Sequence, residues 1–496
     1  MRDLLPHPPG NPRRVHPPYP VTEMPDAEPS AAHSLPRRFL FNVNFIFLFA
    51  LTSNTTGFAV AILLARSLTT EGRGDTALFQ AAIGIGVAFA NLGVGSAVFY
   101  FVSRGEIDAR QALQVGLTVT LIAATVAVIG VLVTALFFED RLRQENVNIP
   151  YGMAIVAAPA FIQLRVVEGL LRAQGRFGVM NSLEVTLPLC MIVSLGGTEL
   201  LFGLNVPRAI IAWTLSFLPP VVAAYVILGR EVWPRRPAGW SLLAKSVRFG
   251  GQTALTALVQ LANYRVDTFL ILALVSRSGV GIYTVANSQV EGLLILSGSV
   301  AIVLLTNITA GDKENAARLT PIVCRNTLLV TAVAAVVAGL IVDLWLPAVF
   351  GSKYQASVEP YLWLLPGMVA LAGARILSSY VFSRGLPIVN FWIAVANLAI
   401  TTPVTVLLLL LYDVPGAAIG TSFGYVLILA MTAYAYARIS GNRIADALIP
   451  RRSDVRLYTD AVLIVIRRLR GLPARAASSP LPQDPPKSPL PREGEG

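Results

Sequence analysis

Residues 391–411 have the sequence FWIAVANLAITTPVTVLLLLL, and no charged side chain interrupts them. A helix of about 20 apolar residues is long enough to cross the hydrocarbon core of a bilayer. This stretch therefore predicts a membrane-spanning α-helix, and the rest of the chain can be searched for apolar runs of the same length.

Runs of the same kind occupy most of the chain. Of the 496 residues, 54% are apolar and only 14% are charged, and the mean hydropathy is +0.64. This composition lies far outside the range of a soluble domain. The apolar runs lie near residues 39–65, 77–102, 112–137, 152–171, 180–202, 209–228, 250–275, 282–306, 326–346, 360–381, 391–411 and 416–437. We predict an all-α integral membrane protein with about 12 transmembrane helices.

Polar segments divide the predicted spans into two sets of six. We predict five regions in order: a disordered Pro-rich tail (1–36), an N-terminal lobe (37–229), a basic interfacial linker (230–248), a C-terminal lobe (249–440) and a basic, Pro-rich tail (441–496). Basic and apolar residues are mixed in 451–470, which favours an amphipathic helix on anionic lipid over a disordered tail. The N-terminus lacks the pattern of a cleavable signal, so the first run is predicted to remain as a span.

The distribution of Lys and Arg predicts the orientation. One set of alternate loops, which includes the linker, holds about 13 of these residues, and the other set holds about 7. Because cytoplasmic loops carry the excess of positive charge, both termini are predicted to be cytoplasmic, with the spans in a bacterial inner membrane. The net charge of +11 is explained by this topology, and we expect no nucleic acid as a partner.

Residues for catalysis or metal binding are scarce. His7, His16 and His33 all precede the first span, and Cys190 and Cys324 lie in or beside apolar runs. The chain has no Gly-Lys-Ser/Thr phosphate loop and no His-Glu-x-x-His motif. We therefore expect no enzymatic activity, no cofactor, no metal site and no disulfide framework.

The two halves share an internal repeat at an offset of about 210 residues. Each half contains a Gly-x-Gly pair, Gly72 and Gly74 in the first and Gly279 and Gly281 in the second. Each half also contains an arginine ten residues before a loop glycine: Arg165 precedes Gly175, and Arg375 precedes Gly385. An offset of six helices keeps matching helices parallel, which predicts two similar lobes facing each other across a V-shaped cleft. The Gly-x-Gly pairs lack the strand context of a nucleotide site, and we interpret them as turn glycines at helix ends.

Charged and amide side chains inside the spans are the candidate functional residues, because a charge in hydrocarbon is unfavourable. Arginines that face the cleft suit a phosphate-bearing ligand, since the planar guanidinium binds phosphate oxygens in pairs. The predicted substrate-binding residues are Arg165, Arg265, Arg375 and Asn263, and the predicted ion-coupling residues are Asp267, Glu291 and Glu168.

Several of these candidates also have a purely structural interpretation. Arg165 and Glu168 are three residues apart on one helical face and can pair with each other. Arg265 and Asp267 are two residues apart, so each can instead bind a neighbouring helix. Asparagines in spans often bond across helices at modest energy, which applies to Asn263. The sequence leaves these alternatives open.

Four segments carry a resemblance to a known family. They are ARSLTTEGRG at residues 65–74, YRVD at 264–267, VGIYTVAN at 280–287 and LPAVFGSKY at 346–354. Over roughly residues 37–440 the chain resembles the lipid-linked oligosaccharide flippases and polysaccharide exporters of the multidrug/oligosaccharidyl-lipid/polysaccharide exporter superfamily. The resemblance implies two six-helix lobes in a V, alternating access, and a substrate of undecaprenyl-pyrophosphate type that carries sugars. The two tails depart from the family pattern.

The function that the resemblance implies is translocation of a lipid-linked oligosaccharide for polysaccharide biosynthesis, driven by an ion gradient because no nucleotide site is present. The expected partners are this lipid-linked glycan, membrane lipids and, through the tails, glycan-assembly enzymes. One alternative is an ion-coupled drug antiporter of the same superfamily, which is expected to prefer acidic residues in its cleft. Another is a membrane polymerase or ligase, which by resemblance carries a larger outer loop than the roughly 20 residues found here.

Overall fold

The computed structural model describes residues 52–90, 93–137, 152–295 and 313–449. The predicted 1–36 tail and nearly all of the 441–496 tail, including the predicted amphipathic helix, lie outside the described residues. Within the described ranges all regular secondary structure is helical, which confirms the prediction of an all-α protein.

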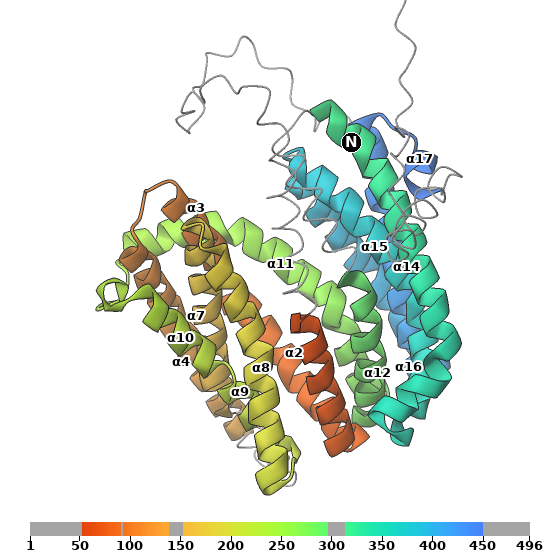
Figure 1. Cartoon of the computed structure of the whole chain (residues 1–496), viewed down its shortest axis with the longest axis horizontal. Helices are drawn as coiled ribbons and strands as arrows, with labels where there is room; N and C mark the ends of the chain where they lie inside the picture. Colours follow the sequence, from red (N-terminus) through yellow and green to blue (C-terminus); the bar gives the residue numbers. More distant parts are fainter. Residues whose placement is uncertain (1–51, 91–92, 138–151, 296–312, 450–496) are drawn as a thin grey trace, which may run out of the picture.

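The first half of the chain supplies eight helical segments to the described structure (Figure 1). They are residues 52–67, α2 (Thr70–Ala90), α3 (Val94–Ser103), α4 (Ala109–Phe137), α7 (Ala154–Ala173), α8 (Phe177–Phe202), α9 (Val206–Leu215) and α10 (Leu218–Leu228). Gly93 has a left-handed conformation (φ 67°), so the second predicted span is interrupted between α2 and α3. Proline at the start of α10 separates it from α9, because proline cannot donate the helical hydrogen bond.

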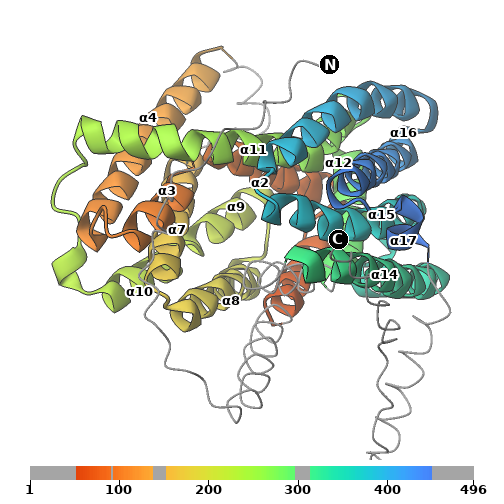
Figure 2. The same cartoon turned by 90° about the horizontal axis from the view of Figure 1, so that it is seen from above.

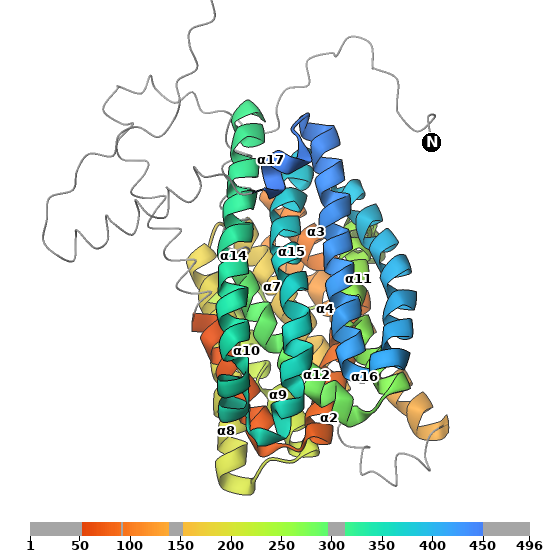
Figure 3. The same cartoon turned by 90° about the vertical axis from the view of Figure 1, so that its right-hand side faces the viewer.

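The second half contains the longer helices. They are η2 (Arg230–Val232), α11 (Trp240–Leu274), α12 (Arg277–Val290), η3 (Glu291–Leu293), α14 (Lys313–Phe350), η4 (Ser352–Ser357), α15 (Val358–Ser383), α16 (Pro387–Ser440) and α17 (Ile444–Leu448). Element α16 is two antiparallel helices joined at Asp413 (φ 53°, ψ −135°), and both are visible in Figure 3. Gly416 is required at this reversal because a Cβ atom there would lie 2.0 Å from the Leu408 carbonyl oxygen.

Several helices can cross a membrane by length and composition. Six segments of the described chain qualify: Gly178–Phe202, Val206–Leu228, Ala254–Leu274, Leu319–Phe350, Ser352–Ser383 and Pro387–Ser440. The last provides two crossings, since it reverses at Asp413. Large apolar side chains cover the outside of these helices, among them Leu200 at 87% and Leu340 at 80% exposure, as expected where lipid replaces water. The chain is a multi-pass membrane protein.

Two bundles face each other and are joined at one end (Figures 1 and 2). Helices α4, α7, α8, α9 and α10 lie in the first bundle, whose core includes Leu113 and Ile162. Helices α14, α15 and α16 lie in the second, whose core includes Leu364 and Met368. The architecture has two lobes, as predicted.

Helix α11 belongs to both bundles. Its first turns pack on the first bundle, where Phe249 stacks on Tyr100 with ring centroids 4.2 Å apart and Lys245 Nζ lies 2.8 Å from Glu106 Oε2. Its later turns pack against α16 in the second bundle. The predicted linker 230–248 is therefore continuous with the seventh predicted span, because α11 begins inside it.

Candidate functional site

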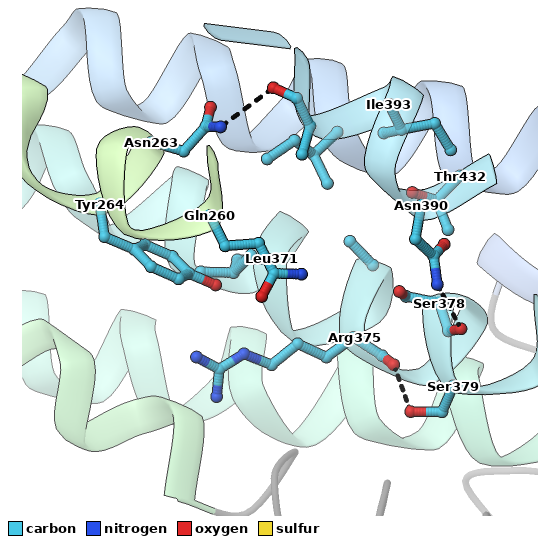
Figure 4. A pocket seen from close by; sticks show the side chains of 13 residues that line it. Gln260, Asn263, Tyr264, Leu371, Arg375, Ser378, Ser379, Asn390, Ile393 and Thr432 are labelled. Atoms are coloured by element: carbon cyan, nitrogen blue, oxygen red, sulfur yellow. Dashed lines mark hydrogen bonds between the residues drawn. The ribbon is translucent and has the colours of Figure 1, made fainter. Parts of the chain in front are cut away.

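A polar cavity of about 450 Å³ lies between α11, α15 and α16 in the second bundle (Figure 4). Its lining combines three amides, three hydroxyl groups, a phenol and a guanidinium: Gln260, Asn263, Asn390, Ser378, Ser379, Thr432, Tyr264 and Arg375. This volume is typical of small-ligand sites, which span about 300–1,000 Å³. Polar groups are unfavourable inside a membrane bundle unless they bind something, so this cavity is the candidate functional site.

Arg375 extends from α15 into this cavity (Figure 4). Its side chain is half-buried, and no carboxylate of the described residues lies within 4 Å of its guanidinium. Its backbone oxygen accepts a 2.8 Å hydrogen bond from Ser379 Oγ, and this bond does not involve the guanidinium. The arrangement offers planar, charged donors to an anionic ligand.

Asn263 lines the same cavity, but its amide is already engaged. Its Nδ2 donates to the carbonyl oxygens of Val259 at 2.9 Å and Ala394 at 3.0 Å, and its Oδ1 accepts a 2.7 Å hydrogen bond from Asn397 Nδ2. These bonds join α11 to α16. The structural interpretation of Asn263 as an interhelical link is therefore the one that the geometry supports most directly.

Asp267 is a buried carboxylate held by neutral donors. It is 3% exposed, and it accepts a 2.7 Å hydrogen bond from the Thr268 N–H, a 3.2 Å bond from the Thr421 hydroxyl and a bond from the Tyr283 hydroxyl. These contacts join α11 to α12 and α16. Arg265 interacts with Asp267 electrostatically, but no ion pair within 4 Å joins them. This geometry supports the structural interpretation of Asp267, in which its side chain binds neighbouring helices.

Arg165 and Glu168 pair with each other in the first bundle. Arg165 Nη1 lies 2.7 Å from Glu168 Oε2, and its guanidinium lies over the Phe161 ring, 5.0 Å from the centroid. Glu184 on α8 interacts electrostatically with both members of this pair. Sequence reasoning missed Glu184, although it is an acidic residue inside the apolar run 180–202 and could have been found by the same criterion.

The seven predicted residues do not converge on one surface. Arg375 and Asn263 share the cavity, whereas Glu291 is half-buried beside α12 and accepts a 2.8 Å hydrogen bond from Asn287 Nδ2. The other residues occupy the separate networks described above. The cavity is also lined by Gln260 and other neutral polar side chains. The sequence analysis did not identify them as candidates, because they carry no charge.

The two bundles are joined where the first turns of α2 and α12 touch, a region we call the lobe junction. A Cβ atom on Gly74 would lie 2.1 Å from the Arg277 carbonyl oxygen, and one on Gly281 would lie 2.0 Å from the Thr70 carbonyl oxygen. The interpretation of these residues as turn glycines is therefore wrong, because both lie inside helices. Glycine is required there because two helix backbones approach without room for a side chain.

Reciprocal hydrogen bonds close the lobe junction. Arg66 donates from Nε to the Val349 oxygen at 2.7 Å and from Nη2 to the Ala348 oxygen at 2.6 Å. In return, Lys353 Nζ donates to the Leu68 oxygen at 2.5 Å and to the Arg66 oxygen at 3.2 Å. Each cation therefore caps the free carbonyl groups at the end of a helix from the opposite half.

Comparison with known proteins places the chain in a family. A family model described as polysaccharide biosynthesis protein matches residues 39–306. The chain belongs to this family. No curated protein sequence matches it significantly.

Solved structures share the fold of this polysaccharide biosynthesis protein. The lipid II flippase MurJ in an inward closed conformation is 12% identical, with a TM-score of 0.66 over 86% of this chain and 94% of that chain. An inward-facing multidrug resistance MATE family transporter of the MOP superfamily is 13% identical, with a TM-score of 0.60 over 80% and 98%. The Vibrio cholerae MATE transporter VcmN in its bent form is 16% identical, with a TM-score of 0.53 over 82% and 97%. Identities this low show a common fold.

The segments that carry the family resemblance lie largely at the lobe junction. Segment 65–74 supplies Arg66 and Gly74, and segments 280–287 and 346–354 supply its partners from the other half. The polar cavity, by contrast, is lined mostly by residues outside these segments. The resemblance therefore concerns the residues at which the two lobes meet, and it says little about the ligand of the cavity.

Proposed function

We propose that this protein is a flippase that moves a lipid-linked oligosaccharide of undecaprenyl-pyrophosphate type across the bacterial inner membrane. The observation that carries the proposal is the polar cavity with the Arg375 guanidinium inside it and no carboxylate within 4 Å among the described residues. A lone cation in a membrane bundle is suited to an anionic ligand rather than a cationic drug.

The cavity chemistry matches the two polar parts of such a substrate. Arg375 would bind an oxygen of the pyrophosphate, since guanidinium groups pair with phosphate oxygens in a fixed geometry. The amides of Gln260 and Asn390 and the hydroxyls of Ser378 and Thr432 would exchange hydrogen bonds with sugar hydroxyls, which both donate and accept. The lipid chain would remain in the bilayer, because its transfer out of hydrocarbon is unfavourable.

Transport would proceed by alternating access around the lobe junction. We place this junction at the outer side of the membrane, with both termini in the cytoplasm, on the strength of the excess of Lys and Arg in the opposite set of loops. The state described here would then be closed to the outside. Opening it would require the α2–α12 contact and the Arg66 and Lys353 bonds to separate.

Asp267 is the proposed coupling residue. Its carboxylate is buried, and the hydroxyl groups of Tyr283 and Thr421 from two other helices converge on it. Binding or release of a cation at this carboxylate would change the net charge at the meeting point of α11, α12 and α16. Such a change can bias two arrangements of these helices.

A complementation experiment tests the proposal. The gene is deleted, lipids are extracted, and mass spectrometry measures whether a complete lipid-pyrophosphate-linked repeat unit accumulates on the cytoplasmic leaflet. The deletion is then complemented with wild type, Arg375→Ala, or Arg384→Ala at equal expression. Arg384 is a matched control because it bonds to the Tyr380 hydroxyl outside the cavity. We expect wild type and the control to clear the intermediate and Arg375→Ala to leave it.

Other outcomes favour the alternatives. Normal lipid intermediates together with lost drug resistance would favour a drug antiporter. Accumulation of the intermediate on the outer leaflet would favour a polymerase or ligase. Full clearance by Arg375→Ala would refute the role assigned to the cavity.

A further inference from the structure

The connection between α10 and α11 presents three exposed arginines, which are Arg230, Arg235 and Arg236. Within the described part of the chain, their side chains make no hydrogen bond and no ion pair. Figure 1 shows this connection on the far side of the first bundle from the lobe junction. Like charges in a short segment repel one another, so this surface is suited to an anionic partner outside the protein.

Contacts with α4 and α10 fix this connection on the first bundle. The Ala238 N–H donates a 2.7 Å hydrogen bond to Thr118 Oγ1 on α4, and Trp233 Nε1 donates a 3.0 Å hydrogen bond to the Tyr225 oxygen on α10. The rings of Trp233 and Tyr225 also pack edge to face, with centroids 6.1 Å apart. A folded segment therefore carries the arginines, and a partner can bind without first ordering a loose loop.

Cations in the opposite set of loops are instead engaged within the protein. Arg66 and Lys353 donate to backbone carbonyl oxygens across the lobe junction. Arg208 Nη1 donates to the Phe202 oxygen at 2.5 Å and to the Gly203 oxygen at 3.1 Å. The arginines of the connection lack such partners among the described residues, so their charge is available to a molecule outside the chain.

Exposed tryptophan accompanies these arginines. Trp240, the first residue of α11, is 80% exposed, and Trp233 is 40% exposed. In a membrane protein, tryptophan is enriched at the level of the lipid headgroups, where one part of the ring meets hydrocarbon and the other meets water. An anionic phospholipid suits both features, because its phosphate accepts hydrogen bonds from guanidinium groups while its chains lie beside the indole ring.

We propose that the surface formed by Arg230, Trp233, Arg235, Arg236 and Trp240, which we call the linker surface, binds the headgroup of an anionic phospholipid. The excess of Lys and Arg in this set of loops assigns the lipid to the cytoplasmic leaflet. The site is separate from the polar cavity, whose lining includes none of these five residues. Because Trp240 begins α11, a bound headgroup would fix the helix shared by both bundles at the membrane surface.

Thermal unfolding of the full-length protein in nanodiscs tests this site without any assumption about the glycan. The nanodiscs contain either phosphatidylcholine alone or a mixture with phosphatidylglycerol, whose headgroup is anionic, at one ionic strength. We expect a higher unfolding temperature of wild type in the anionic nanodiscs, since a lipid that binds the folded state stabilises it. The double variant Arg235→Gln with Arg236→Gln should lose at least half of this shift.

Arg172→Gln with Arg176→Gln is the matched control. Both arginines are exposed at the turn between α7 and α8, on the same predicted side of the membrane, and this variant removes the same charge. It should keep the full shift, because no tryptophan accompanies that turn. All four arginines are exposed, so both double variants are expected to fold.

Two results would overturn the proposal. The first is an equal unfolding temperature of wild type in the two kinds of nanodisc. The second is an equal loss of the shift in the two double variants, because total positive charge rather than the linker surface would then explain the effect of the anionic lipid.

Discussion

The contact between α2 and α12 predicts a measurable response to one added methyl group. In Gly74→Ala the new Cβ atom would lie 2.1 Å from the Arg277 carbonyl oxygen, whereas ordinary contacts begin at 3.4 Å. The oxygen belongs to one helix backbone and the Cβ atom is bonded directly to the other, so the two helices must separate by about 1 Å at this point. Overpacking of this kind costs about 1–3 kcal/mol. That free energy shifts an equilibrium toward an open junction by about 5- to 150-fold.

Distances between spin labels on the two bundles report the shift. Leu201 on α8 and Leu344 on α14 are 75% and 78% exposed, lie near the helix ends on the junction side, and can be labelled after mutation to cysteine. The native Cys190 and Cys324 are first replaced by alanine, which removes competing label sites. Pulsed electron resonance on the variant in nanodiscs should show a longer distance component that is minor or absent in the wild type.

Gly84→Ala is the control on the same helix. An added Cβ atom at Gly84 meets no atom within 4 Å, so this variant should retain the wild-type distances. Identical distance distributions for Gly74→Ala, Gly84→Ala and wild type would refute the reasoning, because the α2–α12 contact would then not hold the closed state. A longer component in both variants would refute it too, since the effect would not depend on the contact.

Three further perturbations follow from the geometry. Arg66→Gln with Lys353→Gln removes the cations that cap helix ends across the junction, and the same distance measurement should show a larger opening for the pair than for either single variant. At Glu106 the hydrogen bond from Lys245 lowers the pKa below its ordinary value of 4.5, so the carboxylate stabilises the fold above that pH and loses this contribution as the pH falls through the lowered pKa. Unfolding temperatures of wild type and Glu106→Gln should therefore differ at neutral pH and converge in acid; a constant difference would contradict the pairing. Asp267→Asn should leave substrate binding intact but abolish the dependence of lipid transport in vesicles on an ion gradient, and an unchanged dependence would exclude this residue from coupling.

The helices could be predicted from sequence because lipid imposes one requirement on every span. A run such as 391–411 must be apolar and helical whatever its neighbours are, so length and hydropathy suffice. The interruptions at Gly93 and Asp413 could not be predicted, because each depends on the backbone conformation of one residue. Gly74 and Gly281 could be identified as a repeated pair, but the reason for glycine at each position is a helix backbone more than 200 residues away in the chain.

The site could be predicted only where a charge marks it. Arg375 was identified because arginine is rare inside a span, and it does line the cavity. Gln260 and Thr432 were missed because neutral polar side chains in spans are common and carry no pattern. Arg73 lies between the predicted runs 39–65 and 77–102, yet it is buried in α2, which packs against α12 from the opposite half of the chain, and no local window includes that helix.

The division of α11 between the two bundles also determines what holds the halves of the chain together. Phe249 and Lys245 attach the start of this helix to the first bundle, while its later turns are built into the second. These noncovalent contacts therefore hold the two bundles together independently of the preceding connection, residues 229–239. A chain severed in that connection should still assemble from two fragments expressed separately, and insertions there should be tolerated where a one-residue insertion within α11 is not.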